Sequence, residues 1–367
     1  MSKASSPDVD VVIVGGGPAG SASALWCARL GLRVVLLERE VFPRHRPGET
    51  LPPGVESVLV QLGVVEQILA ADFTRHLGTW VSWSGPRRFD AFGRDSHGSW
   101  RGFQVPRETL DRILLDEVTG TDAVVRQPCR ALRPLCDRGR VIGVATSDGP
   151  LFARWVIDAG GGGHWLARQF DIPLQFASPR LIARYGYVRG SCPERDDAPE
   201  IAADATGWSW SARIVPGVYH WTRLSLAEDD PRRDCPPEVL AGLEPVGRTR
   251  GADVTWRIVS QPAGPGYVCV GDAAAVLDPA ASHCVLKGLM SGMMAAHVIS
   301  QALSGNASTG AATDAYSSWL REWFQGDARE LRRMYQELPH PPPWAHERPA
   351  SFTEQRPHGD LATLDRA

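Results

Sequence analysis

Three glycines near the start of the chain have the spacing that holds a dinucleotide phosphate. They follow the apolar run 9–14 in the sequence GGGPAG. Gly15 makes a tight turn, Gly17 lets a phosphate approach the backbone, and Gly20 lets a helix pack closely on a strand. A strand, a glycine turn and a helix N-terminus in this order predict a pyrophosphate site.

An acidic residue completes the pattern. A second apolar run, 34–37, ends at Glu38, whose carboxylate is positioned to accept hydrogen bonds from two ribose hydroxyls. Since strand, glycine turn, helix and acid all occur at suitable offsets, we expect a Rossmann-like βαβ unit. Further contacts to the cofactor are expected from Pro18, Ala19 and Arg39.

A later segment identifies the dinucleotide. The sequence GYVCVGDAAAVLDPAASHCVLKGLMSG is a short apolar strand that ends in Gly271-Asp272 and turns through Pro279 into a helix rich in small residues. It resembles the second FAD fingerprint of flavoprotein monooxygenases. In that family the aspartate holds the ribityl chain, and the helix N-terminus, here with Cys284 and Val285, supports negative charge on the reduced flavin. The resemblance therefore implies FAD as the cofactor.

Three other segments resemble the same family. The sequence WVIDAGGGG is similar to its strand ending in Asp158 and Gly160. Arg46 and Glu49 belong to a long loop, FPRHRPGETLPP, whose RPGE looks like the R-x-G-E segment beside the isoalloxazine. A single helix is expected after this loop, over about 55–70. Arg107 opens a helix of the "R-x-x-L/F-D-x-x-L" type, in which it would lie near the flavin. The family order of these segments implies a para-hydroxybenzoate-hydroxylase-like fold.

Composition indicates one enzyme rather than a set of modules. The chain has 367 residues, 43% of them hydrophobic, and a formal charge of −3. The sequence has no long run of Lys or Arg that would indicate a nucleic-acid partner. No apolar stretch has the length of a membrane span, and no metal site is expected. Seven scattered cysteines indicate reduced thiols in the cytoplasm.

The fold class that we expect is α/β, with a discontinuous FAD-binding domain, a mixed β-sheet substrate domain and a C-terminal helix. Trp-rich alternating segments such as GWSWSARIV and YHWTRLSL predict the strands of the substrate sheet. The expected boundaries are 7–72, 105–170 and 260–338 for the FAD-binding domain, 73–104 and 171–259 for the substrate domain, and 339–367 for a disordered tail or partner-binding arm.

Over nearly the whole chain, the sequence is most similar to flavoproteins that oxygenate a tryptophan of a partner polypeptide during cysteine tryptophylquinone maturation. The similarity lies in the RPGETLPP loop, the YGYV and GWSWSA strands and the turn SHCVLK. Cys284 departs from it, because the family has glycine there. The resemblance implies reduction of the flavin by NAD(P)H, formation of a C4a-hydroperoxyflavin and attack on it by an indole or phenol ring.

The catalytic candidates are His283, Arg46, Glu49 and His76. His283 lies in the turn expected to face the isoalloxazine, where an imidazole could move a proton near neutral pH. It could instead cap the following helix. Glu49 could act in catalysis or orient its loop, and His76 is more often structural.

An aromatic substrate cleft is a further expectation. Trp208 and Trp210 alternate on one strand and share a face, as do His220 and Thr222 on the next. With Trp83 they could stack on a substrate ring, together with Trp221 from the same region. The alternative is that these side chains form the core between the sheet and the FAD domain.

Other reactions compete with ring hydroxylation of a protein tryptophan. Halogenases of this family carry a lysine after the R-x-G-E loop, whereas the corresponding window here contains Arg75 and His76 and the chain has only Lys3 and Lys287. A free indole or phenol could be the substrate, and a geranylgeranyl-reductase-like enzyme or a purely structural flavin is a weaker alternative. The sequence leaves open NADH or NADPH, a separate flavin reductase and the oligomeric state.

Overall fold

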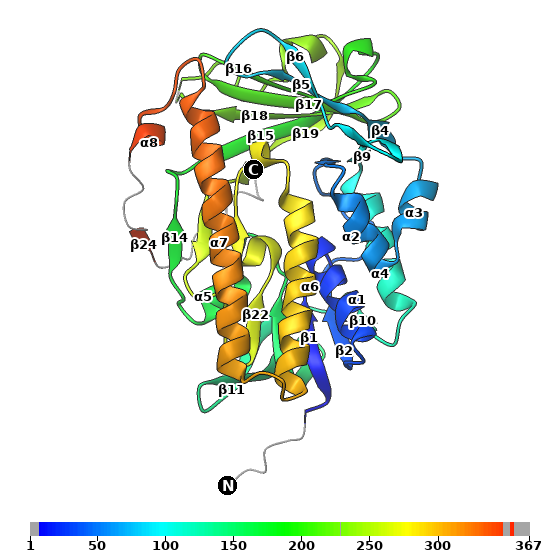
Figure 1. The fold of residues 1–367 in the computed structure, drawn as a ribbon, viewed down its shortest axis with the longest axis vertical. Coiled ribbons are helices and arrows are strands. Elements are labelled where there is room, and N and C mark those ends of the chain that lie inside the picture. Colours follow the sequence, from blue (N-terminus) through cyan, green and yellow to red (C-terminus); the bar gives the residue numbers. More distant parts are fainter. Residues whose placement is uncertain (1–6, 228, 348–352, 356–367) are drawn as a thin grey trace.

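The computed structural model describes residues 7–227, 229–347 and 353–355. Figure 1 shows a lower domain built on a mixed sheet whose central strands are parallel, an upper domain built on a broad, mostly antiparallel sheet, and a long helix that runs from one to the other. This arrangement confirms the expected α/β fold class with a C-terminal helix.

The sheet of the lower domain has the order β10-β2-β1-β13-β12-β11, and β22 adds beside β13. Strand β1 pairs in parallel with β2 and β13, and the inner residues of these strands are apolar and buried, as expected for a sheet covered on both faces. The strands are β1 (Val9–Val14), β2 (Val34–Leu37), β10 (Val124–Arg126), β11 (Ala131–Asp137), β12 (Arg140–Thr146), β13 (Gly149–Asp158), β21 (Ala263–Gly264) and β22 (Tyr267–Cys269).

Helices of this domain pack closely against one another on the sheet. Helix α1 (Pro18–Arg29) lies along α6 (Cys284–Leu303), and a Cβ atom added at Gly292 would lie 2.4 Å from the Ala19 carbonyl oxygen. Small residues therefore allow the two helices to approach. The other helices are α4 (Arg107–Thr119), α5 (Trp165–Gln169) and α7 (Thr309–Gln336).

The upper sheet has seven strands in the order β19-β15-β18-β17-β16-β5-β6. Its predicted strands are confirmed, because GWSWSARIV is β17 and YHWTRLS lies in β18. Trp208 and Trp210 lie on the face toward α7, whereas Trp221 packs in a separate small core on the other face. The strands are β5 (Gly78–Ser82), β6 (Arg88–Ala91), β15 (Ile182–Arg189), β16 (Glu200–Asp204), β17 (Gly207–Val215), β18 (Val218–Ser225) and β19 (Glu244–Asp253).

The segment after β2 differs from the expected long loop and single helix. Within the loop, β3 (Glu49–Leu51) pairs with β9 (Gly102–Val105), which also pairs with β4 (Thr74–His76). The helix expected over 55–70 is two helices, α2 (Val55–Leu62) and α3 (Val65–Ala70). Gly63 ends the first with φ +75°, a left-handed conformation that stops the helix.

A smaller sheet lies where the two domains join. It has the order β23-β20-β14-β24, formed by β14 (Leu174–Phe176), β20 (Arg257–Val259), β23 (Ala275–Val276) and β24 (Thr353–Gln355). Strands β7 (Arg94–Asp95) and β8 (Gly98–Ser99) form a separate two-stranded hairpin. The exact domain boundaries stay a prediction.

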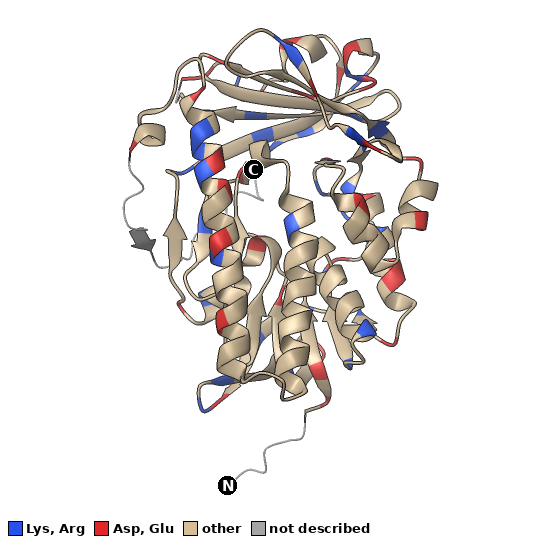
Figure 2. Cartoon of the chain, in the orientation of Figure 1, with Lys and Arg blue, Asp and Glu red and all other residues tan. Residues whose placement is uncertain are grey.

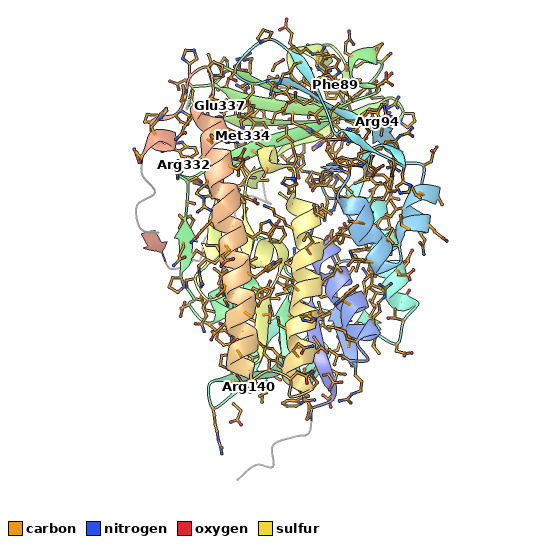
Figure 3. All side chains as sticks on the ribbon, in the orientation of Figure 1. Phe89, Arg94, Arg140, Arg332, Met334 and Glu337 are labelled. Atoms are coloured by element: carbon orange, nitrogen blue, oxygen red, sulfur yellow. The ribbon has the colours of Figure 1, made fainter. Side chains whose placement is uncertain are left out.

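Part of the segment 339–367 is packed rather than free. Helix α8 (Pro343–His346) places Trp344 against Trp256 and Tyr335, with ring centroids 5.3 and 5.2 Å apart. Arg332, labelled with Met334 near the end of α7 in Figure 3, donates to the Trp344 carbonyl oxygen at 2.6 Å. The sequence of this segment has no apolar periodicity and so did not predict the contact, because a single tryptophan is enough to pack the segment against α7. Residues 348–352 and 356–367 lie outside the described residues.

Candidate active site

A cavity of about 590 Å³ lies at the ends of β1, β2 and β13, where dinucleotides bind in sheets of this kind. Most residues that the sequence suggested for the cofactor line it. They are Gly15, Gly17, Pro18, Ala19, Glu38, Arg39, Arg46, Glu49, Arg107, Gly160, Gly271, Asp272, Cys284 and Val285.

The glycine turn has the geometry of a phosphate cradle. Gly15 has φ +105°, and a Cβ atom there would lie 2.4 Å from the Ala159 carbonyl oxygen. At Gly20, which does not line the cavity, a Cβ atom would lie 1.9 Å from the Gly15 carbonyl oxygen. Only glycine fits at either position. The turn therefore exposes the N-terminus of α1, whose first N–H groups lack partners inside the helix, to the cavity.

Glu38 is buried in the cavity wall and organises the loop around it. Its carboxylate accepts hydrogen bonds from the backbone N–H groups of Gly16 at 2.8 Å and Glu40 at 2.9 Å. It also lies 3.1 Å from a guanidinium nitrogen of Arg44. Each carboxylate oxygen can accept more than one hydrogen bond, so a ribose hydroxyl can still be accommodated.

Arg44 is a cavity residue that sequence reasoning missed. It lies between Glu38 and Asp111, with Nη2 3.5 Å from the Asp111 carboxylate. Its side chain is 11% exposed, and its buried Nε has no hydrogen-bond partner among the described residues. The sequence PRHRPGE offers two arginines and a histidine, and only tertiary contacts single out Arg44. Its position above Gly17 suits a phosphate or ribose oxygen.

Glu49 and Arg107 meet in the wall of the cavity. Arg107 Nη1 donates to Glu49 Oε1 at 3.1 Å, and Arg107 Nε donates to Asp111 at 2.8 Å. Burial raises the pKa of Glu49 to about 7, although Arg107 acts in the opposite direction. Burial also raises the pKa of Asp272 on the neighbouring wall. Glu49 can therefore hold or release a proton near neutral pH.

A small cavity of about 50 Å³ shares Gly271, Asp272, Cys284 and Gly288 with the first. His283 lines the small cavity and not the large one, so the structure does not place it among the walls of the cofactor cavity. It is the N-cap residue of α6, but its side chain makes no capping hydrogen bond. Burial, followed by Lys287, lowers the pKa of His283.

Lys287 is a second residue that sequence reasoning did not assign. It lines the small cavity, pairs with Asp327 of α7 and lies over the Trp323 ring at 5.0 Å. Burial lowers the pKa of this lysine to about 8. Its position one turn into α6 could be found only once α6 and α7 were packed together.

A third cavity, of about 440 Å³, lies between the two domains. It shares Arg46 and Arg107 with the cofactor cavity. The other walls come from the loop before β3, from the start of α4 and from the upper sheet, which contributes Tyr187. The Tyr187 hydroxyl accepts a hydrogen bond from Gly48 N–H at 2.8 Å. The full lining is His45, Arg46, Pro106, Arg107, Glu108, Thr109, Tyr185, Gly186, Tyr187, Ile214, Val215, Val218, Val246, Gly247, Arg248 and Arg250.

Several suggested residues lie outside all three cavities. Asp158 accepts hydrogen bonds from Gly160 N–H and Leu166 N–H, and burial raises its pKa to about 6. Pro279 begins a short turn of helix before α6. His76 is buried, and its Nδ1 lies 2.9 Å from the Gly78 carbonyl oxygen.

The aromatic cleft that the sequence suggested is filled. Trp83 Nε1 donates to the Met334 carbonyl oxygen at 2.7 Å, and Trp208 Nε1 donates to the Tyr335 hydroxyl at 2.9 Å. His220 is 2% exposed, and Trp210 packs on it with ring centroids 5.2 Å apart. None of the four lines a cavity described above. The end of α7 covers Trp83 and Trp208, which belong to the domain interface, whereas His220 packs among the rings of Tyr185, Tyr187 and Trp210 within the upper sheet.

The described part of the chain contains no cluster of His, Cys, Asp or Glu that could hold a metal ion. Within the same residues, no helix has the length and apolar character needed to cross a membrane.

Comparison with known proteins agrees with the cofactor cavity. Residues 8–189 match the family model described as FAD binding domain. A tryptophan 2-halogenase of Chondromyces crocatus is 28% identical over 78% of this chain and 60% of its own length, so the chain spans less than two thirds of that relative. A 1H-pyrrole-2-carbonyl-[peptidyl-carrier protein] chlorinase of Pseudomonas fluorescens is 28% identical over 79% of this chain and 75% of its own length.

Solved structures share the fold. The flavin-dependent halogenase CmlS superposes with a TM-score of 0.80 and 25% identity, covering 89% of this chain and 64% of its own. The peptidyl tryptophan dihydroxylase QhpG, essential for tryptophylquinone cofactor biogenesis, superposes with a TM-score of 0.73 and 22% identity, covering 92% of this chain and 77% of its own.

Proposed function

We propose that this chain, an FAD-dependent oxidoreductase with the fold of flavin halogenases and monooxygenases, hydroxylates an aromatic ring, and that the ring is a tryptophan side chain of a partner protein. The observation that carries the proposal is the junction of two cavities at Arg46 and Arg107. One cavity has the walls of an FAD site, and the other opens between the domains next to Glu49.

The residues of the first cavity fit FAD. The glycine turn and α1 would hold the pyrophosphate, Glu38 the ribose, and Asp272 the ribityl chain, with the RPGE loop beside the ring. When bound and reduced, FAD activates dioxygen for transfer of one oxygen atom to the aromatic ring. NAD(P)H supplies two electrons, and the second oxygen atom leaves as water.

The protein's own residues would control protons and water around that reaction. Glu49, with a pKa of about 7, can hold a proton at the cavity junction, and Arg107 fixes its orientation. Tyr187 remains protonated, since burial raises its pKa to about 12. Because its oxygen already accepts the Gly48 N–H, its hydrogen can point to a substrate in the interdomain cavity.

Size and access favour a substrate presented on a protein. The interdomain cavity of about 440 Å³ lies within the range of small-ligand sites and so can take a bicyclic ring. Its rim includes Val215 and Arg250, which are exposed, so a polypeptide backbone can stay outside while the ring enters. One relative is named for a substrate held on a peptidyl-carrier protein, which is compatible with protein-bound presentation in this fold.

Halogenation is the second candidate, because both curated relatives above are named as halogenating enzymes. Among the described residues that line the cofactor and interdomain cavities there is no lysine. Lys287 lies in the small cavity and is paired with Asp327. The absence of a lysine on the substrate side supports hydroxylation over halogenation.

We place the enzyme in the cytoplasm, since all seven cysteines are free thiols. The reductant that we propose is NAD(P)H, used directly or through a separate flavin reductase.

The deciding experiment gives the FAD-loaded protein oxygen, NADH or NADPH, a flavin reductase and bromide. Free indole, free phenols and tryptophan-containing peptides are offered in parallel, and intact masses are recorded. We expect one or two oxygen atoms to be added to the tryptophan of a peptide, and fragmentation names the residue.

Other products would point elsewhere. A brominated product would establish the halogenase, and oxygenation confined to free indole or phenol would establish a small-molecule hydroxylase. The control enzyme is Glu49→Gln, which should bind FAD and consume NAD(P)H but yield hydrogen peroxide instead of oxygenated peptide.

A further inference from the structure

The interdomain cavity has an apolar wall and a basic rim. Its wall is formed by aromatic and β-branched side chains of the upper sheet, among them Tyr185, Ile214 and Val218. Its basic residues are Arg46, Arg107, Arg248 and Arg250, with His45, and the only acidic residue among the lining is Glu108. Such a combination selects a ligand in which an apolar ring is accompanied by negative charge.

The basic residues form two groups with different surroundings. Arg46 and Arg107 lie at the junction with the cofactor cavity, where they contact Glu40 and Glu49. Arg248 and Arg250 lie on exposed positions of β19 in the upper sheet. Figure 2 shows basic positions on the strands of this sheet, β15 and β19 among them. The outer pair is therefore placed to meet charge that lies beside, and not inside, the cavity.

Local backbone geometry directs this outer pair to the cavity rim. β19 is the edge strand of the seven-stranded sheet in the described part of the chain. Its register against β15 shifts between the pairs Tyr185–Arg250 and Tyr187–Val246, so residues 247–249 lie opposite a single residue. Gly247 has φ +74°, which suits a bulge. A bulge in an edge strand redirects side chains, and this one lies at the wall of the cavity.

The positive potential acts on the one histidine of the lining. The pKa of His45 is lowered, first by burial and then by Arg250 and Arg46, and Glu108 opposes this only as the last contribution. His45 therefore stays neutral near pH 7, and the charge of the rim is carried by arginines that do not titrate there.

We infer that the interdomain cavity recognises an acidic segment of the partner polypeptide, in which carboxylates on either side of the aromatic residue meet Arg248 and Arg250 while the ring enters the cavity. This inference rests on the proposed function, because it names the chemistry of that protein substrate. The Asp or Glu side chains would fix the segment and its register without occupying the reacting position.

Binding can be tested without turnover. FAD-loaded, oxidised protein is titrated with fluorescent peptides in which one tryptophan is flanked by Asp, by Ser or by Lys. We expect the Asp-flanked peptide to bind about tenfold more tightly than the Ser-flanked one at low ionic strength, since two exposed ion pairs contribute modestly each. Added salt should reduce this preference.

Variants that reverse or remove the charge of the outer arginines test where the peptide binds. Arg250→Glu and the double variant Arg248→Gln/Arg250→Gln should abolish the preference for the Asp-flanked peptide. Arg329→Glu makes the same charge change on an exposed position of α7 and should leave the preference intact.

Three results would overturn the inference. The first is equal affinity for the Asp- and Ser-flanked peptides, and the second is a loss of charge preference in Arg329→Glu as large as that in Arg250→Glu. The third is displacement of the peptide by NADH together with loss of NADH affinity in Arg250→Glu, which would make the cavity a nucleotide site. Oxygenation of peptide tryptophan without charge preference would remove this inference and leave the proposed function. Charge-selective binding without oxygenation would contradict the proposed function and leave the acidic-segment binding site in place.

Discussion

Arg107 Nη1 lies 3.1 Å from Glu49 Oε1, at the point where the cofactor cavity and the interdomain cavity meet. The two residues come from the start of α4 and from the short strand β3, and Asp111 holds the arginine from its other side. A carboxyl group that can be protonated near pH 7 is thereby fixed at the junction. The protonation state of Glu49 and the position of Arg107 in the cavity wall are therefore coupled.

Glu49→Gln should change the pH dependence of stability. The pKa of Glu49 is about 7 in the folded protein against 4.5 as its ordinary value, so the folded state binds the extra proton between these values. Wild-type stability therefore falls as pH rises through this window, and Glu49→Gln should lack this loss, on the order of 1–3 kcal/mol above pH 7. Thermal unfolding from pH 5 to 8 measures the difference. Glu66→Gln, exposed on α3, is the control, and identical curves for Glu49→Gln and wild type would refute the assignment.

Arg44→Ala should weaken FAD binding. Arg44 is 11% exposed and spans Glu38 and Asp111, so its removal takes a charge-assisted donor from the cavity and leaves two buried carboxylates with fewer partners. Titration of apoprotein with FAD should show an affinity lower by about ten- to a hundredfold. Arg112→Ala, at an exposed position of α4 outside the cavity lining, should have a much smaller effect. Equal losses in both variants would show that Arg44 has no special role.

Gly20→Ala should destabilise the FAD-binding domain. The added methyl group would lie 1.9 Å from the Gly15 carbonyl oxygen, so α1 must move away from the glycine turn. We expect a loss of about 1–3 kcal/mol in the free energy of unfolding, together with weaker FAD binding. Gly310→Ala, in the first turn of α7 with nothing within 4 Å of the added Cβ atom, should be neutral or slightly stabilising. Unfolding in urea compares the two, and an unchanged Gly20→Ala protein would contradict the packing described.

Tyr335→Phe should destabilise the protein more at high pH than at low pH. The Tyr335 hydroxyl donates to Asp278 at 2.8 Å and accepts from Trp208 Nε1, so its loss leaves two buried groups with one partner fewer, at a cost of about 1–3 kcal/mol. Burial raises the pKa of Asp278 to about 6, and removal of the donor should raise it further. The folded state then favours the protonated carboxyl, so the penalty grows as pH rises above 6.

Tyr316→Phe is the matched control for this effect. Its hydroxyl donates to the Cys269 carbonyl oxygen at 2.7 Å and faces no carboxylate. Thermal unfolding at pH 5 and pH 8 should show a pH-independent loss for Tyr316→Phe and a pH-dependent loss for Tyr335→Phe. Parallel losses would mean that Asp278 is not stabilised by Tyr335.

The sequence by itself determined the parts of this protein that depend on neighbouring residues. The glycine turn of GGGPAG, the strand before it and Glu38 after it are specified by local sterics and alternation of apolar residues, and the structure has them at the expected positions. The alternating pattern of the upper sheet also predicted which of its side chains share a face. Local rules did not reveal that Gly63 would split a helix or that Trp344 would fold back onto α7.

Only the tertiary structure decided which polar residues meet and which aromatic side chains are buried. Glu49 and Arg107 are far apart in the chain, and Arg44 is selected from a basic loop because Asp111 of α4 comes to lie beside it. Trp83 and Trp208 became core residues because the end of α7 covers them. Desolvation and ion pairing depend on every element packed around a group, so the pKa of Glu49 and the basic rim of the interdomain cavity follow from the folded arrangement and not from residue order.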